Sequence, residues 1–162
     1  MLGKYLATVI MGVFASIVGY IITITSLIIS RQVYEVYSKF SVNVLTIILG
    51  IIICVVASFI IAAISLLATS KSKTYKEAQA TGSVIQVFCL APMVLSYLNV
   101  NLNSYLYLIP ILNHTNILMD IYSGNINLLN VSLTIISTIV YTVILLYLLI
   151  KSFKSEKVLF GA

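Results

Sequence analysis

Few residues in this chain could do chemistry, and they do not form a catalytic set. His114 is the only histidine, and it stands in "ILNHTN" with no cysteine or carboxylate cluster beside it. The chain contains no HExxH, GxSxG or GxxxxGK[ST] motif, so neither a zinc protease, a serine hydrolase nor a phosphate-binding loop is indicated. Cys54 and Cys89 lie in apolar runs without metal-ligand spacing. We expect a surface or interfacial His114, buried cysteines, no metal, no cofactor and no enzyme.

One charged segment interrupts the middle of the chain, "SKSKTYKEAQAT" at residues 70–81. It can be a solvated loop whose lysines set the membrane orientation. It can also be a short cytoplasmic helix, continuing into the next apolar run, on which a soluble partner presses. In the second interpretation Tyr75, Lys76 and Glu77 are the candidate partner contacts.

The last apolar run carries a polar face. Its members share helical spacing: Asn130, Thr134, Ser137, Thr138 and Tyr141. Such a face can line a transport pathway, or it can supply hydrogen bonds between helices. The second alternative is favoured, because hydroxyl groups in apolar helices commonly bond their own helix or a neighbour.

Composition indicates that these residues sit in a membrane. The 162 residues are 61% hydrophobic and 8% charged, whereas soluble domains carry roughly a quarter charged residues. The nine Lys and Arg give a net charge of +5 but form no stripe with aromatic residues, so nucleic acid is not a predicted partner. Runs of about 20 apolar residues predict membrane-spanning helices. We predict an all-α membrane protein with four transmembrane helices at about 5–30, 42–69, 83–100 and 128–150.

The segment from Tyr105 to Ile121 can be a fifth span or a stretch that enters the membrane and returns. The placement of charges decides between these alternatives. With four spans, one side of the membrane receives Lys4, Lys71, Lys73, Lys76, Lys151, Lys154 and Lys157, and the other receives only Arg31 and Lys39. A fifth span would divide these charges almost evenly. Because positive charge gathers on the cytoplasmic side, we predict a cell-membrane protein with both termini cytoplasmic. Residues 70–81 and the tail 151–162 are then cytoplasmic, and 101–127 form an external re-entrant helical loop before the last span.

Small residues mark one face of each of the first two spans. They recur at helical spacing in each span: Gly12, Ala15, Ser16 and Gly19, and then Gly50, Cys54, Ser58 and Ala62. This spacing lets helix backbones approach closely. No Asp, Glu, Lys or Arg lies inside a predicted span, which argues against a carrier that couples transport to ions by itself.

The order of short motifs resembles a known family. "GKYLA" opens the first span, "SKTYKEAQ" precedes the third, "APMVLSY" lies within it, "YLIPILN" lies outside, and "KSFKSEKVLF" ends the chain. Together they resemble the C-terminal part of the membrane subunit of type-2 ABC exporters, closest to the sodium-efflux permease group called NatB. In that family each permease has six spans, short re-entrant helices precede the last one, and a separate ATPase subunit binds ATP.

The resemblance has one departure. In the family, Gly-Lys follows a cytoplasmic coupling helix, whereas this chain reaches Gly3-Lys4 directly. We therefore expect the C-terminal part of a permease that lacks the N-terminal spans and the coupling helix. It would act with an ABC ATPase and with a permease partner or N-terminal half that supplies the missing spans.

The resemblance implies an exporter permease that moves substrate outward. In this interpretation Asn130, Thr134, Ser137 and Tyr141 are pathway candidates, and Pro110 and Asn113 shape an external gate. The alternative is a small non-transporting membrane protein, an immunity or regulatory factor that binds a larger transporter.

Overall fold

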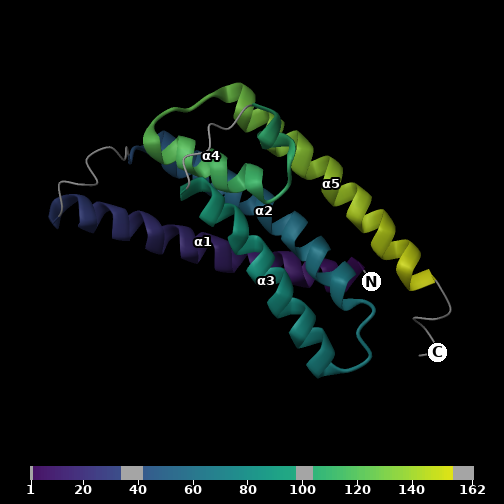
Figure 1. The fold of residues 1–162 in the computed structure, drawn as a ribbon. Helices are drawn as coiled ribbons and strands as arrows, with labels where there is room; N and C mark the ends of the chain where they lie inside the picture. Colours follow the sequence, from purple (N-terminus) through teal and green to yellow (C-terminus); the bar gives the residue numbers. More distant parts are fainter. Residues whose placement is uncertain (1, 34–41, 98–103, 155–162) are drawn as a thin grey trace.

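The computed structural model describes residues 2–33, 42–97 and 104–154, and all regular structure in these residues is helical. This confirms the predicted all-α class for the described part of the chain. The elements are α1 (Leu2–Val33), α2 (Val44–Thr69), α3 (Tyr75–Tyr97), the short 3-10 helix η2 (Ser104–Leu108), α4 (Leu112–Ser123) and α5 (Leu128–Lys154) (Figure 1).

Three of the described helices are long and apolar enough to cross a membrane: α1, α2 and α5. Their apolar stretches have 26 or 27 residues, which is about 40 Å of helix against a hydrocarbon core of about 30 Å. They match three of the predicted spans. The fourth, at 83–100, falls on α3 and on residues 98–100, which lie outside the described residues. The count of four spans stays a prediction.

Helix α2 is the centre of the bundle. It packs against α1, α3, α4 and α5, and Ile53, Ile60 and Ala63 on its surface are fully buried. Its first turn is fixed by a reciprocal cap, in which Asn43 Oδ1 accepts from the Thr46 backbone N–H and Thr46 Oγ1 accepts from the Asn43 backbone N–H. This cap satisfies donors that apolar surroundings would leave without partners.

Small residues bring α1 against α2: the spacing predicts close approach at these faces, and the structure pairs the two faces with each other. Ser16 Oγ lies 3.2 Å from Ser58 Oγ, and a Cβ atom on Gly12 would meet Ser58 at ordinary contact distance. Gly50 lies directly under the ring of Tyr20, so that a Cβ atom there would overlap the ring and its hydroxyl. The missing side chain of Gly50 is therefore what admits Tyr20.

Helix α4 is the longer arm of a helical hairpin that it forms with η2. Its 12 residues extend about 18 Å, too short to cross a bilayer. The chain enters α4 through Ile111, which has a positive φ of 73°, a costly conformation for a β-branched residue. It leaves through Gly124 in the left-handed conformation. There the Gly124 and Asn125 N–H groups bond the Ile121 and Asp120 carbonyls, which is a Schellman ending.

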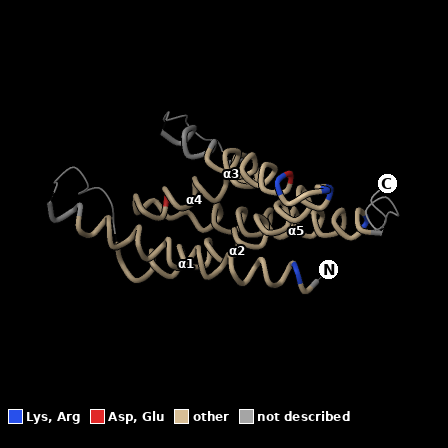
Figure 2. The backbone as a smooth tube through the Cα atoms, turned by 90° about the horizontal axis from the view of Figure 1, so that it is seen from below, with Lys and Arg blue, Asp and Glu red and all other residues tan. Residues whose placement is uncertain are grey.

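Lysines gather at one end of the molecule. Figure 2 shows the described lysines at the start of α1, in the α2–α3 turn and near the end of α5. The α4 helix lies toward the opposite end of α2 (Figure 1). These lysines are the ones that the charge count assigned to one side of the membrane, and they lie toward one end of the molecule. Two others from that count are not included: Lys157 is outside the described residues, and the side chain of Lys154 is not described.

Candidate functional site

A buried polar cluster joins the start of α4 to the middle of α5. Asn113 is completely buried, and its Nδ2 donates to Ser137 Oγ at 3.0 Å and to Thr138 Oγ1 at 3.5 Å. Its Oδ1 accepts from the His114 backbone N–H at 2.8 Å. The Asn113 amide therefore bonds through both its oxygen and its nitrogen at a fully buried position.

The hydrogen bonds of Thr138 fix the tautomer of His114. Thr138 Oγ1 donates its only proton to the Thr134 carbonyl at 2.6 Å. It must then accept from His114 Nε2, which lies 3.2 Å away. His114 is consequently the neutral tautomer with its proton on Nε2. Its Nδ1 is a bare acceptor, buried and without a hydrogen-bond partner.

Burial agrees with this neutral form. His114 is 7% exposed, and burial lowers the pKa of His114 from 6.5 to about 4. The pair does not resemble a base and its nucleophile, because the Thr138 proton points to a backbone carbonyl. Among the described residues no three His, Cys, Asp or Glu side chains lie together as a metal site.

A further side-chain hydrogen bond joins the two arms of the hairpin, η2 and α4. The Tyr107 hydroxyl, from η2, donates to Asp120 Oδ2 on α4, and burial, together with this carboxylate, raises the pKa of Tyr107. The Tyr107 carbonyl is within 3.3 Å of Ser137 Oγ on α5. The two arms of the hairpin are thus tied to each other and to α5.

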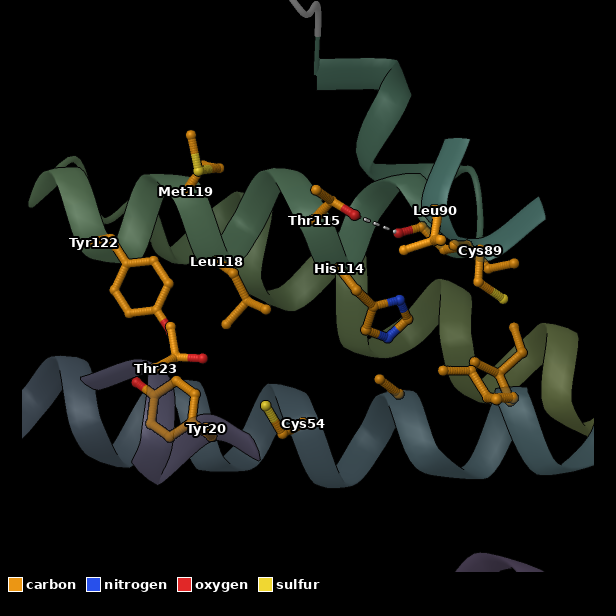
Figure 3. Close-up of a pocket in the computed structure, with 14 residues that line it drawn as sticks. Tyr20, Thr23, Cys54, Cys89, Leu90, His114, Thr115, Leu118, Met119 and Tyr122 are labelled. Atoms are coloured by element: carbon orange, nitrogen blue, oxygen red, sulfur yellow. Dashed lines mark hydrogen bonds between the residues drawn. The ribbon is translucent and has the colours of Figure 1, made fainter. Parts of the chain in front are cut away.

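A partly open cavity of about 400 Å³ adjoins the cluster. It lies among α1, α2, α3 and α4, and Figure 3 shows the His114 ring directed into it between α4 and α2. Cys54 and Cys89 also line it. Both cysteines are half-buried and free, less enclosed than the sequence predicts.

The predicted polar face of α5 divides in the structure. Thr134, Ser137 and Thr138 are buried against the hairpin. Ser137 and Thr138 accept hydrogen bonds from Asn113 on α4, whereas the Thr134 hydroxyl is buried without a hydrogen-bond partner. Asn130 is half-buried. Tyr141 is 39% exposed, whereas the next residue of α5, Thr142, is buried.

The predicted gate residues lie on the two sides of one turn. Pro110 is half-buried in the turn that precedes α4, and Asn113 is the centre of the buried cluster. The structure joins Asn113 to Ser137 by a hydrogen bond, whereas Tyr141, one turn further along α5, is 39% exposed.

The predicted partner contacts are the first three residues of α3. Tyr75 is its first residue and is 84% exposed, and Lys76 and Glu77 are exposed beside it. Thr74 Oγ1 accepts from the Glu77 N–H, and Glu77 Oε2 accepts from the Lys73 N–H at 2.8 Å. These bonds cap the helix, so the charged segment is a turn followed by a helix that continues to Tyr97.

His114 is the residue that sequence reasoning placed wrongly. It is buried rather than at the surface, because α4 folds back against α2 and α5 instead of lying outside them. The available signal was the position of His114 next to Asn113, shortly before a span that carries a polar face.

Comparison with known proteins identifies no relative. No protein-family description, no curated protein and no solved structure matches the chain.

Proposed function

We propose that this chain is the transmembrane part of an ATP-driven exporter, a type-2 ABC permease fragment with four spans and both termini in the cytoplasm. A separate ABC ATPase subunit would bind ATP, and a permease partner would supply further spans. The NatB-like resemblance is the source of this proposal, and sodium is its substrate only by that resemblance.

The observation that carries the proposal is the hairpin of η2 and α4 before α5. Asn113, at the turn, contacts Ser137 and Thr138, which lie about 14 Å along α5 from Leu128. This is deep enough for a segment that enters the membrane and returns on the same side. Such a hairpin before the last span is what the resemblance implies for residues 101–127, of which 101–103 lie outside the described residues.

The exposed start of α3 supports a cytoplasmic partner surface. Tyr75 is a large, almost fully exposed aromatic side chain on a capped helix end. Figure 2 shows the described lysines toward the end of the molecule where α3 begins. Exposed aromatic residues are common anchors of protein interfaces. In the proposal, ATP-driven movement of the ATPase reaches the bundle through Tyr75, Lys76 and Glu77.

The proposal assigns two roles to the polar residues of α5. Thr134 and Ser137 hold the hairpin, and with Pro110 and Asn113 they set the position of the external gate. Tyr141 and Asn130 are less buried and would face a pathway formed together with the partner spans.

Association with an ATPase tests the proposal. The tagged chain is co-expressed with any ABC ATPase and permease subunits that neighbouring genes encode, and it is purified in mild detergent. We expect co-purification and ATP hydrolysis, and we expect Tyr75→Ala together with Glu77→Gln to reduce both at least fivefold. Glu77→Gln keeps an oxygen for the helix cap. Lys151→Ala, an exposed lysine at the same end of the molecule, is the matched control and should change neither quantity.

A second candidate is a non-transporting membrane protein that binds a larger transporter. The burial of Ser137 within the chain favours it, because the Ser137 hydroxyl already has hydrogen-bond partners in the chain. Stable association with a complete transporter, without any ATPase activity that depends on Tyr75, would support this candidate and exclude the first.

A further inference from the structure

The cavity beside His114 has the size and lining of a small-molecule site. Its volume of about 400 Å³ is within the range of ligand pockets, which are mostly apolar with a few fixed polar groups. Ile60 and Ile61 from α2 and Leu118 from α4 form apolar walls. Leu90 and Met119 on its border are exposed apolar side chains, so the cavity is reached past apolar surface.

The hydroxyl groups of threonines in the lining already have acceptors. Thr23 Oγ1 donates to the Gly19 carbonyl at 2.9 Å, and Thr115 Oγ1 donates to the Ile111 carbonyl at 3.3 Å (Figure 3). The Tyr20 hydroxyl likewise donates to a backbone carbonyl, at 2.9 Å. These groups are committed to the protein itself.

His114 Nδ1 is different. The proton of Thr138 is committed to Thr134, so Nε2 of His114 must donate and Nδ1 must carry a free lone pair. This nitrogen is buried and has no partner, although buried polar atoms are almost always hydrogen-bonded. A ligand that satisfies it has to bring a donor, and the apolar walls exclude a charged one.

We propose that this cavity binds a neutral, mainly apolar small molecule that carries one hydroxyl group. The hydroxyl donates to Nδ1 of His114, and the apolar body lies between α2, α3 and α4. The site does not depend on the proposed exporter function, since it is formed by the chain alone.

Nitrogen NMR tests this directly, because His114 is the only histidine in the chain. The full chain is labelled with ¹⁵N-histidine, placed in lipid nanodiscs and titrated with 1-dodecanol. Methyl dodecyl ether, which keeps the apolar body and lacks the donor, is the matched probe. We expect dodecanol to move the Nδ1 resonance saturably toward the hydrogen-bonded position and to leave Nε2 unchanged. The ether should bind about fivefold more weakly, as expected for one lost hydrogen bond, and should not move Nδ1.

A substitution that fills the cavity separates binding in the site from partitioning into lipid. Ala57 lines the cavity from α2, and Ala57→Leu should abolish the saturable shift. Ala7→Leu adds the same atoms at an exposed position of α1 and should leave the shift intact.

Three results would overturn the proposal. One is a proton on Nδ1 in the free protein. Another is an Nδ1 that is already hydrogen-bonded, as by water, and does not respond to dodecanol. The third is an equal response to the alcohol and the ether. Each can be read in the native chain, so the test stands even if Ala57→Leu does not fold.

Discussion

Helices α1 and α2 meet through small residues, whereas α4 is held to α5 by side-chain hydrogen bonds. At the first interface the absence of a side chain on Gly50 leaves space for the Tyr20 ring. The contact between the Ser16 and Ser58 hydroxyls adds to this packing. At the second, Asn113 and His114 bond the hydroxyls of α5. The difference follows from length. A long apolar helix has packing along its whole side, but a short one in apolar surroundings needs a few strong, directional contacts to fix its position.

The comparison predicts that the α1–α2 interface fails when volume is added. Gly50→Ala places a Cβ atom where the Tyr20 ring lies, and Tyr20 cannot move without losing its bond to the Thr46 carbonyl. We expect a loss of about 4 kcal/mol in unfolding free energy, from overpacking and one lost hydrogen bond. Unfolding by SDS titration, followed by circular dichroism, measures it. Gly19→Ala, where a Cβ atom meets nothing, is the control, and equal effects of the two substitutions would contradict the packing account.

The α4–α5 contact should fail when polar atoms are removed. Asn113→Ala leaves Ser137 Oγ without a donor and the His114 backbone N–H without its Oδ1 acceptor, and it opens a small void. We expect a loss of about 3 kcal/mol by the same titration. Asn125→Ala, at an exposed position after α4, should be neutral. A loss below about 1 kcal/mol for Asn113→Ala would mean that apolar packing, and not the cluster, positions α4.

Of these two interfaces, only the α4–α5 contact should lose stability in mild acid. The pKa of His114 is about 4 in the fold and about 6.5 in the unfolded chain. Below pH 6.5 the unfolded chain therefore takes up a proton that the fold excludes, and stability falls with pH. We expect a loss of about 2 kcal/mol between pH 7 and pH 5.

His114→Gln supplies the control for this pH dependence. It removes the only histidine and should remove most of the decrease between pH 7 and pH 5. A decrease of the same size in His114→Gln would assign the acid sensitivity to another group.

The smallest effect is expected for the hydroxyl at the α1–α2 interface. Ser16 Oγ can also bond the Val13 carbonyl of its own helix at 2.9 Å, so Ser16→Ala should cost only about 0.6 kcal/mol. Thr25→Ala, at an exposed position of α1 where the hydroxyl bonds the Ile21 carbonyl of its own helix, is the matched comparison. If Ser16→Ala cost as much as Asn113→Ala, the two interfaces would not differ in kind.

Some of this architecture follows from the sequence alone. Runs of apolar residues longer than a bilayer crossing determine α1, α2 and α5, because backbone groups in lipid must be satisfied within a helix. The lysine positions determine which helix ends lie together, and the spacing of small residues determines which faces of α1 and α2 meet. These signals are local or periodic, so they can be read without knowledge of tertiary contacts.

The tertiary structure decided what the polar residues do. Asn113 and Ser137 are 24 positions apart, and no periodicity joins a short helix after a turn to one side of a later span. Only the fold-back at Ile111 brings them into contact. That contact separates Thr134 and Ser137, which are buried, from Tyr141, which is exposed. It also buries His114, whose ring lies beside the cavity (Figure 3), and leaves Nδ1 without a hydrogen-bond partner. The sequence determined where apolar helices form, because that depends on composition, and the fold determined which polar atoms find partners, because that depends on direction and distance.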